Sequence, residues 1–123
     1  MELDEPATNP TIWTAAAEGR TEDVRQMIKD GANVLETNWA GVSALHYAAE
    51  RGNHVLVTLL LEKGADVNGK TLSGFSPLHD SAAGGHAATV KILLDKGAHV
   101  NVKTADGTTP LHASVEGGHD AVV

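Results

Sequence analysis

Gly41-Val42-Ser43-Ala44-Leu45-His46 decides the fold, because this segment returns as Gly74-Phe75-Ser76-Pro77-Leu78-His79 and again as Gly107-Thr108-Thr109-Pro110-Leu111-His112. The interval is 33 residues each time, from position 41 to 74 and from 74 to 107. A second set of segments keeps the same register: Gly31-Ala32-Asn33-Val34, Gly64-Ala65-Asp66-Val67-Asn68 and Gly97-Ala98-His99-Val100-Asn101. Self-similarity at a fixed period of this length is the signature of a repeat array.

Each returning segment predicts the start of a helix. The hydroxyl of Ser76 or Thr109 can cap a helix, the proline that follows is tolerated in the first turn, and the histidine at the third helical position can reach back to the cap. Ser43 keeps the cap without the proline, so that helix should start less rigidly. In this unit we expect the first helix to run roughly over residues 44 to 51.

A second helix should follow in each unit, after a glycine turn at Gly52, Gly85 or Gly118. Apolar residues at helical spacing support it: Val57, Leu60 and Leu61, and one repeat later Val90, Leu93 and Leu94. We expect these helices to end at Gly64 and Gly97, where glycine suits a left-handed stop, with Lys63 and Lys96 in the last turn.

The period and the Thr/Ser-Pro-Leu-His core resemble the ankyrin repeat, and the resemblance covers nearly the whole chain after Pro10. It implies an all-α repeat solenoid, an ankyrin-like stack of helix-turn-helix units joined by β-hairpin-like loops that project sideways. The expected organisation is a flexible acidic tail over residues 1–8 and a repeat domain over 9–123, with units at 9–41, 42–74, 75–107 and an incomplete 108–123. The first unit lacks the Pro-Leu-His core, carries Trp13 at the histidine position and is expected to act as a cap.

Composition narrows the possible functions. The sequence has no cysteine and a formal net charge of −7, and it contains no apolar run near the roughly 18 residues that span a bilayer. We therefore expect an intracellular protein, cytoplasmic or nuclear or both, that does not insert into membranes. Its negative charge disfavours nucleic-acid binding, which relies mainly on clustered Lys and Arg.

The seven histidines do not indicate an enzyme. His46, His79 and His112 recur once per repeat, about 10 Å apart if the helices stack, whereas one zinc ion needs ligands near 2 Å. We expect them to bond to the cap hydroxyl and adjacent backbone, His86 and His119 to bond locally in the turn between helices, and His54 and His99 to be solvated. The sequence contains no phosphate loop and no His-Glu-x-x-His motif, so we expect no cofactor, metal or catalytic residue.

By the resemblance, the binding surface is the concave face, made of the hairpin tips and the exposed side of the first helices. Trp39, Leu72 and Phe75 are the strongest candidates, because large apolar groups at exposed tips cost solubility and aromatic residues are enriched among interface hot spots. Alternatively, Trp39 and Phe75 fold back and pack on the neighbouring repeat. Asp80 would place a negative charge beside this patch. The full set of candidate positions is Trp39, Val42, Tyr47, Glu50, Arg51, Leu72, Ser73, Phe75, Asp80, Ala105, Asp106 and Thr108.

The predicted function is a non-catalytic interaction module or adaptor that binds another protein. The alternative is a regulatory or inhibitory N-terminal domain of a longer multidomain protein or enzyme. The incomplete last unit favours a chain that continues past Val123, and self-association through that unit is the other expectation. Asn68 and Asn101 match the position at which ankyrin proteins are hydroxylated. The competing expectation is that these asparagines bond within the hairpin.

Overall fold

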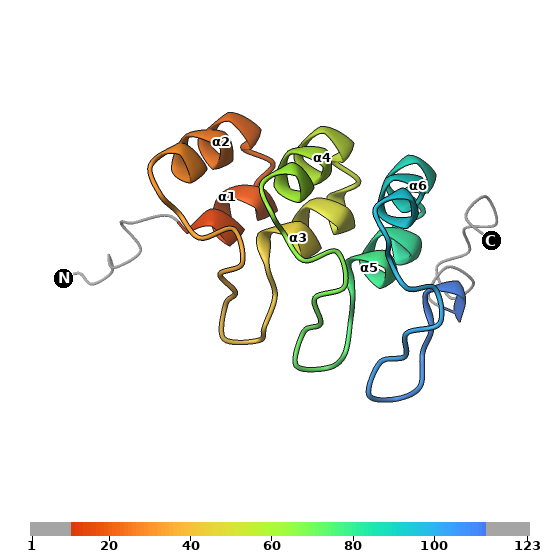
Figure 1. The fold of residues 1–123 in the computed structure, drawn as a ribbon. Helices are drawn as coiled ribbons and strands as arrows, with labels where there is room; N and C mark the ends of the chain where they lie inside the picture. Colours follow the sequence, from red (N-terminus) through yellow and green to blue (C-terminus); the bar gives the residue numbers. More distant parts are fainter. Residues whose placement is uncertain (1–10, 113–123) are drawn as a thin grey trace.

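The computed structural model describes residues 11–112, which form three pairs of antiparallel helices joined by long connections (Figure 1). This is the all-α repeat stack that the sequence predicts, and no strand occurs within the described range. An isolated antiparallel bridge pairs Thr37 with Ser43, and the chain turns helical again at residues 110–112. The helices are α1 (Ile12–Ala17), α2 (Thr21–Lys29), α3 (Ala44–Arg51), α4 (His54–Glu62), α5 (Pro77–Ala83) and α6 (Ala87–Asp95).

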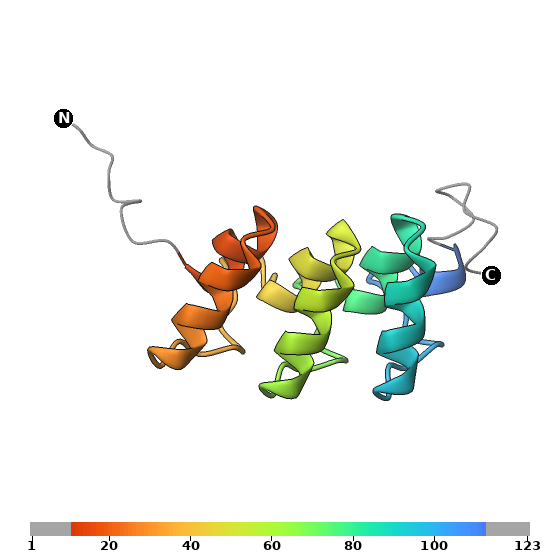
Figure 2. The ribbon, with the colours of Figure 1, turned by 90° about the horizontal axis from the view of Figure 1, so that it is seen from above.

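The helices form two rows. The first helices of the repeats lie side by side, with α3 packed between α1 and α5, and the second helices make a parallel row in which α4 packs between α2 and α6 (Figure 2). The first, second and third connections, residues 30–43, 63–76 and 96–109, project together on the side of the first row (Figure 1). A surface made of α1, α3 and α5 with the connections beside them therefore runs along the stack.

Reciprocal caps start α3 and α5, as the sequence predicts, whereas α1 has a simple cap by Thr11. The Ser43 Oγ accepts from the backbone N–H of His46, and the His46 Nδ1 accepts from the backbone N–H of Ser43 at 3.2 Å. Ser76 and His79 form the same pair at 3.2 Å. The predicted bounds of α3 are confirmed. The ends of the second helices differ slightly, because α4 stops at Glu62 and leaves Lys63 as the residue after the last turn.

The core lies between the two rows. Leu45, Leu56, Leu60 and Leu93 are fully buried, and each such side chain contributes about 1.5–3 kcal/mol of transfer free energy. Alanines of α1 and α3 are also fully buried, which lets neighbouring first helices approach closely: Ala15, Ala16, Ala48 and Ala49. Few aromatic residues are needed, because the core is divided among interfaces between adjacent repeats.

Two predicted segments fall outside the described range. The acidic tail over residues 1–8 lies before it, and most of the incomplete unit over 108–123 lies after it. The expectations about Gly118 and His119 in that unit stay predictions.

Candidate functional site

Side chains inside each connection hold its tip in shape. The Asn38 Oδ1 accepts from the backbone N–H groups of Ala40 and Val42, at 2.9 and 3.0 Å. Its Nδ2 donates to the hydroxyl of Tyr47 on α3 at 2.9 Å. One and two repeats later, Thr71 and Thr104 accept from the N–H four residues on, each at 3.1 Å. Each tip is thus closed by its own polar residue.

Backbone hydrogen bonds join neighbouring tips. The N–H of Leu72 donates to the carbonyl of Ala40 at 3.0 Å, and the N–H of Ala105 donates to the carbonyl of Ser73 at 2.9 Å. These approaches require glycine beside them: Gly74 has a φ of +89°, and a Cβ on it would lie 3.0 Å from the Ala105 nitrogen. The three connections therefore form one continuous edge.

The three favoured apolar residues differ in exposure. Trp39 is 90% exposed and Leu72 is 80% exposed, at equivalent positions of consecutive tips. The expectation that Trp39 folds back onto the neighbouring repeat is therefore wrong. Phe75 is only 38% exposed and packs edge-on against His79 of its own repeat, with the ring centres 5.7 Å apart. The fold-back expectation thus holds in part for Phe75, although the contact is not with a neighbouring repeat.

A groove of about 270 Å³, here called the central groove, lies between the first and second connections over α3 and α5. It brings together half of the predicted binding residues, which come from four separate segments of the chain. The predicted residues that line it are Val42, Tyr47, Glu50, Ser73, Phe75 and Asp80, and they are joined there by Ala40, His46 and Thr71. Trp39 and Leu72 are not among its lining residues.

Two carboxyl groups line the central groove. Asp80 is half-buried in the first turn of α5, where burial, with a smaller effect from the charge of Glu50, raises its pKa from an ordinary 3.8 to about 7. The negative charge expected at Asp80 is therefore one that titrates near neutral pH. Across the described part of the chain, no Lys or Arg forms an ion pair with Asp80 or Glu50.

The repeated histidines do more than cap helices. The Nε2 of His46 lies 3.0 Å from the carbonyl oxygens of Gly69 and Phe75, and the Nε2 of His79 lies 2.8 Å from that of Thr108. Burial lowers the pKa of both histidines, so the neutral ring donates through Nε2 and accepts through Nδ1. The capping pattern in the sequence predicts only the hydrogen bonds made by Nδ1. The partners of Nε2 lie 23 to 29 residues away in the sequence, so no local pattern could have predicted them.

Two different side chains link the first helices. The guanidinium of Arg51 donates to the carbonyl of Ala17 at 3.0 Å, and the Nε2 of His86 lies 2.8 Å from the carbonyl of Glu50, which is the equivalent position one repeat later. The expectation that His86 bonds only within its turn is therefore wrong, because the contact crosses to the preceding repeat. Arg51 is exposed and already holds the preceding helix, and its role in partner binding stays a prediction.

The third connection carries the remaining predicted residues. The Oδ1 of Asp106 accepts from Thr104 and, at 2.9 Å, from the hydroxyl of Thr108, and these bonds lower the Asp106 pKa. Asp106 is exposed and keeps its charge at neutral pH. Ala105 takes the tip position of Trp39 and Leu72 without a large side chain.

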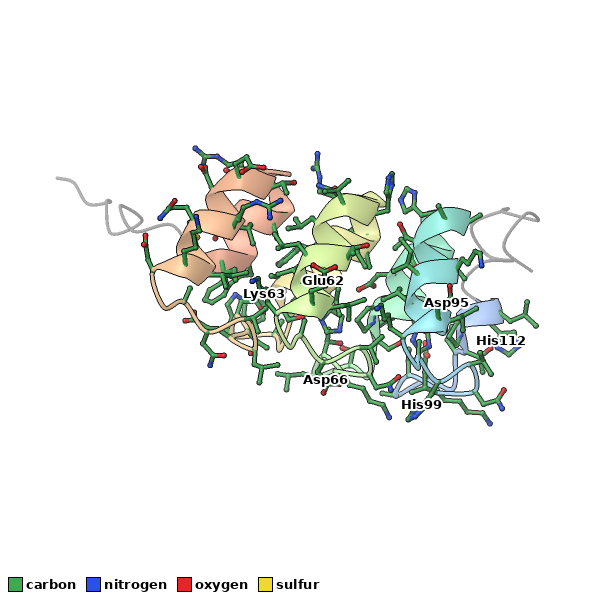
Figure 3. All side chains as sticks on the ribbon, turned by 45° about the horizontal axis from the view of Figure 1, so that its top comes forward. Glu62, Lys63, Asp66, Asp95, His99 and His112 are labelled. Carbon is green, nitrogen blue, oxygen red and sulfur yellow. The ribbon has the colours of Figure 1, made fainter. Side chains whose placement is uncertain are left out.

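Asn68 bonds across repeats. Its Nδ2 donates to the carbonyl of Gly97 at 3.1 Å, and its Oδ1 accepts from the backbone N–H of His99 at 2.8 Å. Its backbone N–H donates to the Asp66 Oδ1 within its own connection at 2.9 Å, so the expectation of bonding within the hairpin is wrong for the side chain only. Asn101 is exposed, and hydroxylation at either position stays a prediction. Figure 3 labels Asp66 and His99, which hold equivalent positions on the second and third connections; His99 is exposed, as expected.

Two further features, a cluster of metal-ligating side chains and a membrane-spanning helix, are absent from residues 11–112. No three His, Cys, Asp or Glu side chains in that range gather closely enough to ligate a metal ion. None of the helices in the same range combines the length and the apolar character that crossing a membrane requires.

Comparison with known proteins agrees with this architecture. A family model described as ankyrin repeats (3 copies) matches residues 12–104 and again residues 66–123. No curated protein gives a significant match. Repeats of this family are generally protein-interaction modules and are typically non-catalytic.

Proposed function

We propose, from the premise that the chain belongs to the ankyrin-repeat family, that it is a non-catalytic module that binds another protein through the connection tips and the central groove. The observation that carries this proposal is the exposure of Trp39 and Leu72, 90% and 80%, at equivalent positions of consecutive tips. Because these large apolar side chains are exposed, a partner could bury them without breaking contacts that stabilise the fold.

The surroundings of these side chains support the proposal. The tips are joined by the Leu72–Ala40 and Ala105–Ser73 backbone bonds, and Asn38 holds the first tip to Tyr47. A partner would therefore meet a surface whose backbone is already ordered, which lowers the entropy cost of association. Trp39 is of the residue type that often contributes most of the binding energy in protein interfaces, where aromatic side chains are surrounded by polar ones.

The expected partner is a protein rather than a nucleic acid. The formal net charge of −7 opposes a phosphate backbone, and the candidate surface carries Glu50, Asp80 and Asp106. The absence of cysteine from the sequence supports action in the cytoplasm, the nucleus or both. The alternative setting, a regulatory domain of a longer polypeptide, stays a prediction.

Affinity capture from source-cell lysate tests the proposal. The wild type is compared with a Trp39→Ala/Leu72→Ser variant and with Val55→Ser, which removes a 54% exposed apolar side chain from α4 in the other helix row. Circular dichroism checks that all three remain folded. We expect a protein retained by the wild type and by Val55→Ser and lost from the tip variant. Equal retention by all three would contradict a binding surface at the tips.

A further inference from the structure

The central groove combines negative charge with aromatic walls. Glu50 stands near the end of α3 and Asp80 in the first turn of α5, and the charge of Glu50 contributes to the raised pKa of Asp80. Tyr47 and Phe75 line the same groove. A half-buried carboxylate beside a second carboxylate is unfavourable in the free protein, and an added cation would relieve this repulsion.

We propose that the central groove binds an arginine side chain presented by the partner protein, with its guanidinium beside Glu50 and Asp80; this rests on the function proposed above. Guanidinium fits this lining better than other groups. It is planar, it is weakly hydrated, it presents a fork of donors to carboxylates and it stacks on aromatic rings. A neutral apolar group would leave both carboxyl groups buried without a partner.

The side chains that line the central groove are already held in position by contacts within the protein. Asn38 donates to the Tyr47 hydroxyl at 2.9 Å, and the Phe75 ring rests on His79. The Glu50 carbonyl is bonded to His86 at 2.8 Å, which fixes the end of α3. The side chains that would surround the guanidinium therefore lose little freedom on binding.

The groove has room for one side chain, since its volume is about 270 Å³. The apolar tips at Trp39 and Leu72 lie outside the groove lining, so a partner loop would place arginine in the groove and apolar residues on the tips.

Binding of a cation here should depend on pH. The titratable groups that line the groove are His46, Tyr47 and Glu50 from α3 and Asp80 from α5. His86, the residue before α6, bonds to the Glu50 backbone, while on α6 itself Lys91 pairs with Asp95 at 3.6 Å. Asp80, whose pKa is about 7, loses its proton between pH 6 and 8, so affinity should rise several-fold over that range as its carboxyl group ionises.

The test is a titration of the nitrogen-15-labelled full chain with the peptide acetyl-Leu-Arg-Leu-amide, and NMR chemical shifts report the binding. A matched peptide replaces arginine with citrulline, which keeps the shape and removes the charge. We expect saturating shifts at Val42, Ser73 and Asp80 with the arginine peptide, and at least fivefold weaker binding of the citrulline peptide. Glu50→Gln/Asp80→Asn should weaken arginine binding at least fivefold and abolish its pH dependence, whereas Glu36→Gln, which removes an exposed carboxylate from the first connection, should not.

Equal binding of the two peptides, no saturating binding of either, or shifts confined to other surfaces would overturn the arginine proposal. The function proposed above is judged separately. If the captured protein is lost with Trp39→Ala/Leu72→Ser but fully retained by Glu50→Gln/Asp80→Asn, the tips bind a partner and the arginine proposal is wrong. Loss with both variants supports both proposals.

Discussion

Replacing Asp80 by asparagine should stabilise the protein, and the gain should grow with pH. The native pKa of Asp80 is about 7, against an ordinary 3.8, because the carboxyl group is half-buried beside Glu50. Between pH 3.8 and about 7, the carboxyl group of Asp80 is protonated in the native state and ionised in the unfolded state. The stability contributed by this proton is fully present below pH 3.8 and is lost as pH rises to about 7.

The magnitude follows from the two pKa values. Each pKa unit corresponds to 1.36 kcal/mol, so a shift of about 3 units sets a ceiling of ~4 kcal/mol on the ionisation penalty at high pH. Between pH 5 and pH 8, the free energy of unfolding of Asp80→Asn should rise relative to wild type by about 2.6 kcal/mol. A native pKa one unit lower reduces this difference to ~1.4 kcal/mol.

Urea denaturation of both proteins at pH 5 and pH 8, followed by circular dichroism, measures this double difference. Other titrating groups are common to the two proteins and cancel. Glu36→Gln serves as the control, because it removes an exposed carboxylate from the first connection. A double difference for Asp80→Asn that is zero, negative or no larger than the control would refute the assignment of a buried, repelled carboxyl group.

Three further outcomes are expected. Leu60→Ala should lower the free energy of unfolding by about 2–5 kcal/mol in urea, because Leu60 is fully buried. Gly74→Ala should lower the free energy of unfolding more than Gly107→Ala. Their φ angles are nearly equal, +89° and +88°, but of these two glycines only a Cβ on Gly74 would approach other atoms of residues 11–112, with the Ala105 nitrogen 3.0 Å away. Equal losses would contradict a close approach between tips. In an Asp80→Asn background the melting temperature should fall as pH drops below 6.5, because the lowered pKa of His46 makes its protonation favour the unfolded state. A flat calorimetric profile down to pH 5 would count against this.

Local chemistry explains why so much of the fold is readable from the sequence. The cap, the histidine that returns to it and the glycine that ends a helix are all decided within a few residues, as the confirmed bounds of α3 illustrate. Repetition then multiplies this evidence, since the same local structure recurs every 33 residues. The candidate surface could be proposed only through the resemblance, because position in a repeat says which side chains lie near the concave face.

The sequence by itself determined the repeat, its helices and its caps. It left open whether Trp39 folds back, and the structure decided that this side chain is exposed. Tertiary structure alone decided which groups meet across repeats. His86 reaches the Glu50 carbonyl, and the Nε2 of His46 reaches Phe75, over separations of 36 and 29 residues. It also decided that Asp80 titrates near neutral pH. The physical reason is that hydrogen-bond partners and desolvation depend on the distances between stacked repeats, whereas propensities and caps depend only on neighbours along the chain.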